Sequence, residues 1–133
     1  MPPCAPGARP PRVGVDLVDV AAFRERLEGQ EALLGEVFGE AELSYCRSQA
    51  RPWTHLAARF AVKEAALKAL GTGLAGAMRW QDVEVTRDEA GAPSLVFHGA
   101  AADVLVRSGL RPGSVSLSHT RDHAVGVVLL LPA

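Results

Sequence analysis

Two carboxylates stand at positions where the local sequence pattern does not favour charge. Asp16 interrupts a strand-like run of valine and leucine shortly after Gly14, and the interior of a strand disfavours aspartate. Glu64 lies at the edge of an apolar helical stripe, one turn after Phe60. Mg²⁺ favours such a pair, because it takes one or two protein carboxylates, keeps several waters and binds phosphate oxygens. Asp16 and Glu64 are therefore candidates for a magnesium–phosphate site.

Basic side chains follow the same helix at helical spacing. Lys63 falls inside the apolar stripe, Arg59 lies one turn before it, and Lys68 lies one turn after Glu64. Ionised groups beside a core stripe cost free energy unless they are paired or bound to a metal or phosphate, and basic groups near Mg²⁺ would bind phosphate. In the alternative interpretation, Lys63 and Lys68 extend to water and Glu64–Lys68 is an ordinary i,i+4 pair. The helix pattern taken alone favours this alternative.

The stretches that carry these residues alternate between strand and helix patterns. Strand patterns cover residues 12–18, 82–86, 94–97, 114–119 and 124–131, and helix patterns cover residues 21–34, 40–47, 53–70 and 100–108. Asp19 is placed to cap the first helix and Gly71 to end the long one. A turn over residues 88–93 predicts a hairpin. The order predicts an α+β fold with a small, mostly antiparallel sheet packed against a long central helix.

Composition excludes several classes of protein. The chain has 133 residues, 48% hydrophobic and 22% charged, which is ordinary for one globular domain, expected over residues 12–133. A net charge of -1 without aromatic–basic interleaving disfavours nucleic-acid binding. Cys4 and Cys46 lack metal-site spacing, so we expect a reducing cytoplasm and no disulfide framework. No apolar run approaches the roughly 18 residues of a membrane span, and the proline-rich residues 1–11 are expected to form a flexible arm.

Three segments resemble the holo-acyl-carrier-protein synthase family, the short class of 4'-phosphopantetheinyl transferases, in sequence, order and spacing. They are residues 14–19 (GVDLVD), residues 59–73 (RFAVKEAALKALGTG) and residues 115–119 (VSLSH). The K-E-A-x-x-K segment followed by G-T-G is the specific signal. Residues 38–46 and 80–85 are also similar, so the resemblance covers essentially residues 13–131. It implies the phosphopantetheinyl transferase fold.

The resemblance also implies an activity and a set of site residues. Family members transfer the phosphopantetheine arm of coenzyme A to a serine of an acidic acyl carrier protein and release adenosine 3',5'-bisphosphate. Asp16 and Glu64 match the family's magnesium ligands, and Lys68 matches the lysine that contacts the pyrophosphate. The residues expected to line the coenzyme A site are Arg59, Phe60, Lys63, Lys68, Gly71 and His119. The short class implies a homotrimer with active sites between subunits.

The incoming serine must lose a proton, and we hypothesise that Glu64 accepts it through a water or orients that water as the base. His119 is a less favoured base, because the family places this histidine at the nucleotide end. His55, His98 and His123 match no motif, so surface or packing roles are expected for them.

One departure from the family pattern concerns the carrier protein. Ala22 occupies a position where the family usually has an arginine on the helix that meets the carrier. The arginines left for a basic patch are Arg24, Arg26, Arg47 and Arg51. The carrier therefore stays open between fatty-acid, polyketide and other pathways. The alternatives are a broad-range transferase and a non-catalytic coenzyme A-binding trimer, and the retained carboxylates and Lys68 argue against the second.

Overall fold

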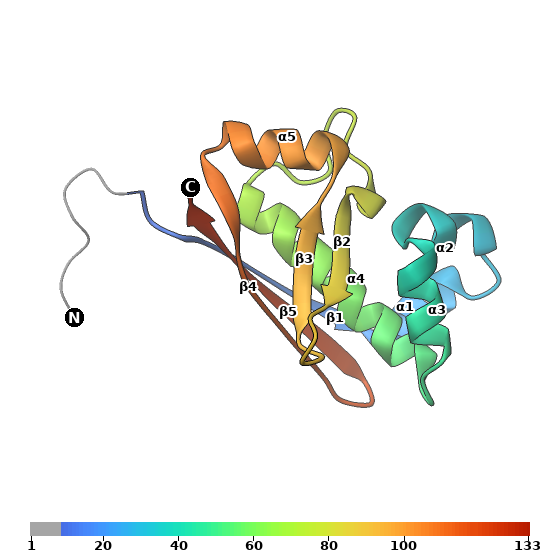
Figure 1. The fold of residues 1–133 in the computed structure, drawn as a ribbon. Coiled ribbons are helices and arrows are strands. Elements are labelled where there is room, and N and C mark those ends of the chain that lie inside the picture. Colours follow the sequence, from blue (N-terminus) through green and yellow to red (C-terminus); the bar gives the residue numbers. More distant parts are fainter. Residues whose placement is uncertain (1–8) are drawn as a thin grey trace.

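The fold consists of two antiparallel sheets around one long helix (Figure 1). The computed structural model describes residues 9–133. One sheet has the strand order β1-β5-β4, with β1 (Arg12–Asp19), β4 (Leu110–His119) and β5 (His123–Pro132). The other sheet is a hairpin of β2 (Val83–Arg87) and β3 (Pro93–Phe97). The helices are α1 (Val20–Leu27), α2 (Glu31–Val37), α3 (Glu40–Arg47), α4 (Pro52–Leu70) and α5 (Gly99–Arg107), with a single 3₁₀ turn, η1 (Trp80–Asp82). The expected α+β fold is confirmed.

Helix α4 is the central element, with β1, β4 and β5 on one side and the β2–β3 hairpin on the other (Figure 1). Pro52 occupies its first turn, and Gly71 ends it with φ 81°, a left-handed conformation that favours glycine. Its alanines, among them Ala61, Ala65 and Ala69, are buried and let the neighbouring backbones approach closely. Because α4 is covered on both sides, it has no broad solvent-facing stripe.

Two glycines allow the three-stranded sheet to lie directly on α4. A Cβ atom on Gly126 would meet the Val62 nitrogen at 2.5 Å and the Ala61 carbonyl carbon at 2.7 Å. A Cβ atom on Gly14 would overlap the backbone oxygen of Ala65. Backbone cannot move aside as a flexible side chain can, so β1 and β5 require glycine at these positions.

We expect Gly126→Ala to lower the free energy of unfolding by about 1–3 kcal/mol, the usual range for overpacking, and Gly14→Ala by at least as much. Gly35→Ala is the matched control, because nothing lies within 4 Å of its Cβ position inside α2. Alanine there should be neutral or stabilising by about 0.5–1 kcal/mol. Urea unfolding measures all three variants, and equal stability of Gly126→Ala and Gly35→Ala would contradict the close approach.

Most expected elements agree with the structure to within a few residues, and one is wrong. The helix expected over residues 21–34 is two helices, α1 and α2, because Gly29 adopts φ 80° between them. The Asp19 side chain caps α1 by accepting the backbone N–H of Ala22 at 2.9 Å, as predicted. Strand β4 begins at Leu110, earlier than expected, and has an irregular register between Pro112 and Ser114.

The N-terminal arm and the two cysteines were further features expected from the sequence. Residues 1–8, including Cys4, lie outside the described part of the chain, whereas Arg9 donates a hydrogen bond to the Ser108 carbonyl at 3.0 Å. Cys46 is a free, buried thiol on α3, and burial raises its pKa to about 11. Among the described helices, none has both the length and the apolar composition needed to cross a membrane.

Candidate active site

Asp16 and Lys68 form an ion pair that joins β1 to the last turns of α4. The Lys68 Nζ donates to Asp16 Oδ1 at 2.8 Å and to the Val15 carbonyl at 3.1 Å. The Lys68 side chain is 55% exposed and the Asp16 side chain 18% exposed, so the pair is open to solvent on the lysine side. The hydrogen bond to Asp16 raises the pKa of Lys68. The Glu64–Lys68 ion pair of the alternative interpretation does not form within the described residues, because Lys68 pairs with Asp16.

Glu64 lies one turn before Lys68 and shares its surroundings with Asp16. Burial raises the pKa of Glu64, the negative charge of Asp16 raises it further, and Lys68 opposes both effects. Glu64 thus lies near enough to Asp16 and Lys68 for both charges to influence its pKa. A hard divalent cation would offset this repulsion, and Mg²⁺ commonly binds through one or two carboxylates plus water and phosphate. Residues 9–133 contain no group of three or more His, Cys, Asp or Glu side chains that would hold a metal alone.

A groove opens beside Asp16 between β1, α1, α2 and α4, with a volume of about 450 Å³. Phe60 of α4 lines it and packs against Trp80 with ring centroids 5.1 Å apart and against Phe23 with centroids 5.3 Å apart. Leu33 of α2 lines the groove as well. Asp16 therefore belongs to the lining of a largely apolar groove.

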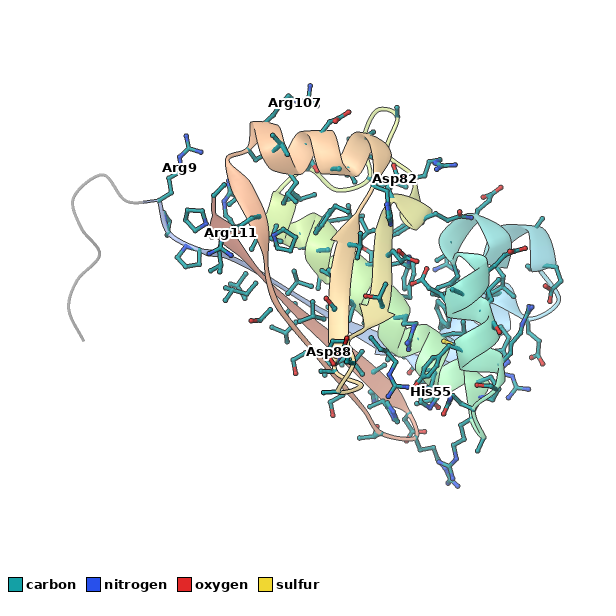
Figure 2. All side chains as sticks on the ribbon, in the orientation of Figure 1. Arg9, His55, Asp82, Asp88, Arg107 and Arg111 are labelled. Carbon is teal, nitrogen blue, oxygen red and sulfur yellow. The ribbon has the colours of Figure 1, made fainter. Side chains whose placement is uncertain are left out.

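A second charged cluster surrounds Tyr45 near the start of α4. The guanidinium of Arg59 lies over the Tyr45 ring at 4.3 Å from its centroid, and that of Arg87 at 4.7 Å. His55 packs edge-on against Tyr45 and also against His119, with centroids 5.3 Å apart in the second pair. Burial lowers the pKa of His55, and the charges of His119, Arg59 and Arg87 lower it further. Figure 2 locates His55 at the α1–α3 end of the molecule.

The arginines of this second cluster form no ion pair within the described residues, although Glu42 and Glu84 line the same pocket. Arg59 is only 5% exposed, and its Nε is buried without a hydrogen-bond partner in the described structure. No carboxylate of residues 9–133 forms an ion pair with Arg59 or Arg87. Unpaired buried charge is costly, so the cluster is suited to an anionic group. Tyr45 and Arg87 were not predicted as site residues, because they come from α3 and β2. His55, for which a surface or packing role was expected, also belongs to this cluster. Its position one helical turn before Arg59 was the signal for it in the sequence.

The structure differs from both expectations for Lys63, because its side chain neither reaches water nor lines an open site. Its side chain is fully buried, and Nζ donates to Glu42 Oε1 at 2.9 Å, to the Val83 carbonyl at 2.6 Å and to the Trp80 carbonyl at 3.2 Å. Glu42 also accepts the backbone N–H of Val85 at 3.1 Å. Burial lowers the pKa of Lys63, and Glu42 opposes that shift. Lys63 thus joins α4 to α3, η1 and β2 in the interior.

The other residues named from the sequence are Gly71, His98 and His123. Gly71 is exposed at the end of α4. His98 contacts Glu84 at 2.9 Å, and His123 lies 3.9 Å from Asp19.

The two clusters lie on different faces of α4. Arg59 and Glu64 are five positions apart, which separates them by about 140° around the helix axis. The carboxylate pair and the Arg59 cluster therefore face different directions of one chain.

The unpaired arginines of the second cluster and the lysine beside two carboxylates are the kinds of side chain that suit phosphate-bearing ligands. Residues 12–128 match the 4'-phosphopantetheinyl transferase superfamily, and the chain belongs to this family. The chain is 45% identical over 118 residues to a holo-[acyl-carrier-protein] synthase of Syntrophotalea carbinolica, covering 88% of this chain and 92% of that protein. It is 43% identical over 118 residues to the same kind of protein from Koribacter versatilis, covering 88% and 94%.

Solved structures agree with this assignment. A Chronobacterium ammoniagenes ACPS–CoA complex superposes with a TM-score of 0.82 at 28% identity, covering 94% of this chain and 99% of that chain. The holo-[acyl-carrier-protein] synthase of Neisseria meningitidis superposes with a TM-score of 0.80 at 28% identity, covering 90% and 96%. The fold is therefore the phosphopantetheinyl transferase fold.

Proposed function

We propose that this chain is a holo-acyl-carrier-protein synthase that transfers the 4'-phosphopantetheine of coenzyme A to a serine of an apo-acyl carrier protein. The serine Oγ forms a bond to the pantetheine-side phosphorus, and the bond to the adenosine-side phosphate breaks, releasing adenosine 3',5'-bisphosphate. The observation that carries the proposal is the Asp16–Lys68 pair beside Glu64 in a chain of this family. We place the reaction in the cytoplasm, where a free thiol such as Cys46 persists.

Asp16, Lys68 and Glu64 each have a role in this reaction. Asp16 and Glu64 would hold Mg²⁺, which when bound offsets the charge of the pyrophosphate. Lys68, fixed between β1 and α4, stabilises the charge that develops on the leaving phosphate. Glu64 would receive the serine proton through a water or orient that water as the base. His119 belongs to the other cluster and is the less favoured base.

We assign the nucleotide end of coenzyme A to the cluster of Arg59 and His119. This cluster faces away from Glu64 on the same chain, so one ligand touches both only if two copies of the chain combine. The outer face of the β1-β5-β4 sheet offers the contact: Val13 is 67% exposed, Val15 54% and Leu17 66%. Exposed apolar faces of this kind mark protein–protein contacts. This arrangement and the family resemblance support sites shared between the subunits of a homotrimer.

Val15→Asp tests the assembly. A charge at the centre of a buried apolar contact should dissociate the oligomer to monomers and lower transfer at least about tenfold. Light scattering after size-exclusion chromatography gives the mass. Val106→Asp is the matched control, because Val106 is 74% exposed on α5 and should leave the mass unchanged. A wild-type chain that is already monomeric and fully active would contradict shared sites.

The decisive test of the function is mass spectrometry of a panel of apo carrier proteins incubated with coenzyme A, with and without Mg²⁺. A phosphopantetheine-sized mass gain that requires the metal and disappears in Asp16→Ala is expected. The panel also ranks fatty-acid, polyketide and peptide-synthase carriers, which separates a dedicated from a broad-range transferase. Coenzyme A binding without any mass gain would instead indicate a non-catalytic binder.

A further inference from the structure

Tyr45 of α3 contacts two arginines that come from different elements. The guanidinium of Arg59, on α4, lies 4.3 Å from the centroid of the Tyr45 ring, and that of Arg87, at the end of β2, lies 4.7 Å from it. Arg87 also donates from Nη1 to the Tyr45 hydroxyl at 2.5 Å. One aromatic side chain therefore contacts both guanidiniums through its ring and one of them through its hydroxyl.

Both arginines are held in place by further contacts. Arg87 donates from Nε to the carbonyl of Gly91, in the turn of the β2–β3 hairpin, at 3.1 Å. Arg59 is held by burial, since it is only 5% exposed, and its Nε has no hydrogen-bond partner in the described structure. A side chain that is already ordered loses less entropy when a ligand binds, so the two guanidiniums are prepared for an anion.

The carboxylates nearest to the two arginines are bound to other groups. Glu42 and Glu84 line the same pocket, which has a volume of about 240 Å³ between α3, α4 and β2. Glu42 accepts from Lys63 at 2.9 Å and from the backbone N–H of Val85 at 3.1 Å. Glu84 contacts His98 at 2.9 Å. Tyr45 thus holds the arginines mainly through its ring, and a cation–π contact leaves N–H donors free that a carboxylate partner would occupy.

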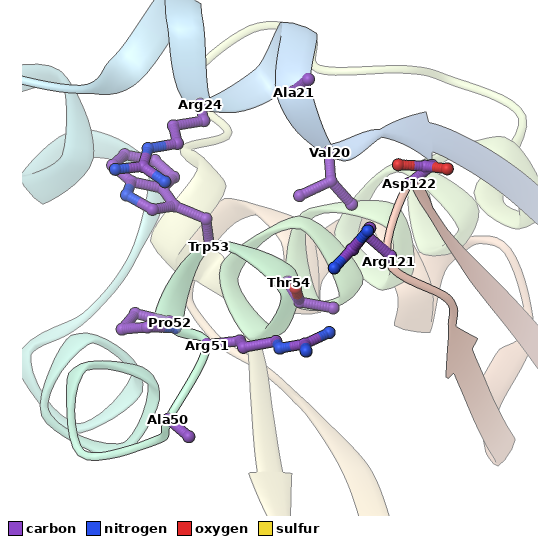
Figure 3. Close-up of a pocket in the computed structure, with 10 residues that line it drawn as sticks. All are labelled: Val20, Ala21, Arg24, Ala50, Arg51, Pro52, Trp53, Thr54, Arg121 and Asp122. Carbon is purple, nitrogen blue, oxygen red and sulfur yellow. The ribbon is translucent and has the colours of Figure 1, made fainter.

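A second arginine-lined cavity, at the start of α4, lacks such a support. Its volume is about 480 Å³, and Figure 3 shows Arg51 and Arg121 extending toward the same space next to Thr54. Within residues 9–133, neither arginine forms an ion pair or a cation–π contact. Both would have to become ordered when a ligand binds. The Tyr45 pocket is therefore the better prepared of the two for a phosphate group.

We propose that Tyr45 is a positioning residue that holds Arg59 and Arg87 for one phosphate monoester, the 3'-phosphate of coenzyme A. The proposal rests on the part of the proposed function that assigns the nucleotide end of coenzyme A to the cluster of Arg59 and His119. A phosphate monoester is close to doubly charged at neutral pH, and guanidiniums bind it through several charge-assisted hydrogen bonds. Tyr45 and Arg87 thereby make this chain prefer coenzyme A over dephospho-coenzyme A, which lacks the 3'-phosphate.

Titration calorimetry of the full chain with coenzyme A and with dephospho-coenzyme A tests this role without any carrier protein. Tyr45→Phe keeps the ring but removes the hydroxyl that Arg87 contacts, and we expect Kd for coenzyme A to rise about threefold. Tyr45→Leu removes both contacts, and this Kd should rise at least about tenfold. Kd for dephospho-coenzyme A should stay within about twofold of the wild-type value in both variants.

Arg87→Gln shows whether Tyr45 acts through this arginine. Alone, it should raise Kd for coenzyme A at least about tenfold, because a charged donor to the phosphate is lost. Added to Tyr45→Leu, it should contribute less than its separate effect, since the ring no longer holds the guanidinium. Arg107→Gln is the matched control, because Arg107 is exposed on α5 far from His55 (Figure 2) and should leave both Kd values unchanged. Thermal unfolding verifies that the variants are folded.

The outcomes separate the role of Tyr45 from the proposed function. An unchanged Kd for coenzyme A in Tyr45→Leu overturns the positioning role, while wild-type transfer still supports the enzyme. Equal weakening of both ligands in Tyr45→Phe and Tyr45→Leu overturns it as well, because Tyr45 would then only support the fold. A preference for coenzyme A that survives in Arg87→Gln and is lost in Arg51→Gln/Arg121→Gln overturns it in favour of the cavity at the start of α4. Wild-type protein that prefers coenzyme A yet modifies no carrier overturns the proposed transfer and leaves the positioning role supported.

Discussion

Asp16→Ala and Glu64→Gln are each expected to lower kcat/KM for transfer at least about a hundredfold, because each removes one of the two carboxylates that would hold Mg²⁺. The effect of Glu64→Gln is the more informative, since glutamine keeps the shape of the side chain but cannot take a proton. Initial rates of holo-carrier formation, measured by mass spectrometry across a range of Mg²⁺ concentrations, give the comparison. Both variants should need more Mg²⁺ for half-maximal rate.

The free energy of unfolding of these variants distinguishes a loss of activity from a loss of folded protein. The Lys68 end of the Asp16–Lys68 pair is largely exposed, so losing the pair should change the free energy of unfolding by no more than about 1 kcal/mol. Glu64→Gln removes a carboxylate that Asp16 repels, so its unfolding midpoint should be unchanged or higher. Glu89→Gln, at an exposed turn, is the matched control with wild-type kinetics. Near-normal rates in Glu64→Gln would rule out its role in the metal site and in proton transfer.

Local sequence patterns predicted the parts of the fold that depend on neighbouring residues. Asp19 as a cap and Gly71 as a helix end follow from the geometry of helix termini, and the structure shows both. Asp16 and Glu64 were recognisable because each carboxylate departs from the pattern around it. The sequence could indicate them as a pair, but only the packing of β1 on α4 places them in one region.

Contacts between segments far apart in the chain could not be predicted from the sequence pattern. The apolar-stripe argument assumes a helix with one solvent face, whereas α4 is covered on both sides. Lys63 was therefore expected at a surface or a ligand, and its partner Glu42 comes from another helix with no signal in the spacing. Similarly, Arg59 meets Tyr45 and Arg87 from two other elements. The break at Gly29 was missed because the apolar spacing continues across it.

Lys63→Met is expected to lower the free energy of unfolding by about 3–5 kcal/mol, the usual cost of removing one partner of a buried ion pair. Methionine fills a similar volume, so the cost arises mainly from Glu42, which would keep its charge in the interior without its ammonium partner. The Val83 and Trp80 carbonyls would lose their donor as well. Urea unfolding of the full chain measures the change.

Lys68→Met on the same helix is the matched control, because its ammonium is exposed and its loss should cost no more than about 1 kcal/mol while lowering transfer strongly. The Glu42→Gln/Lys63→Met double variant should recover part of the stability lost in Lys63→Met, since no buried charge is left unpaired. Equal stability of Lys63→Met and Lys68→Met would contradict the buried pair. The expected opposite pattern, with Lys63 affecting stability and Lys68 affecting turnover, would show that two lysines of one motif serve the interior and the reaction separately.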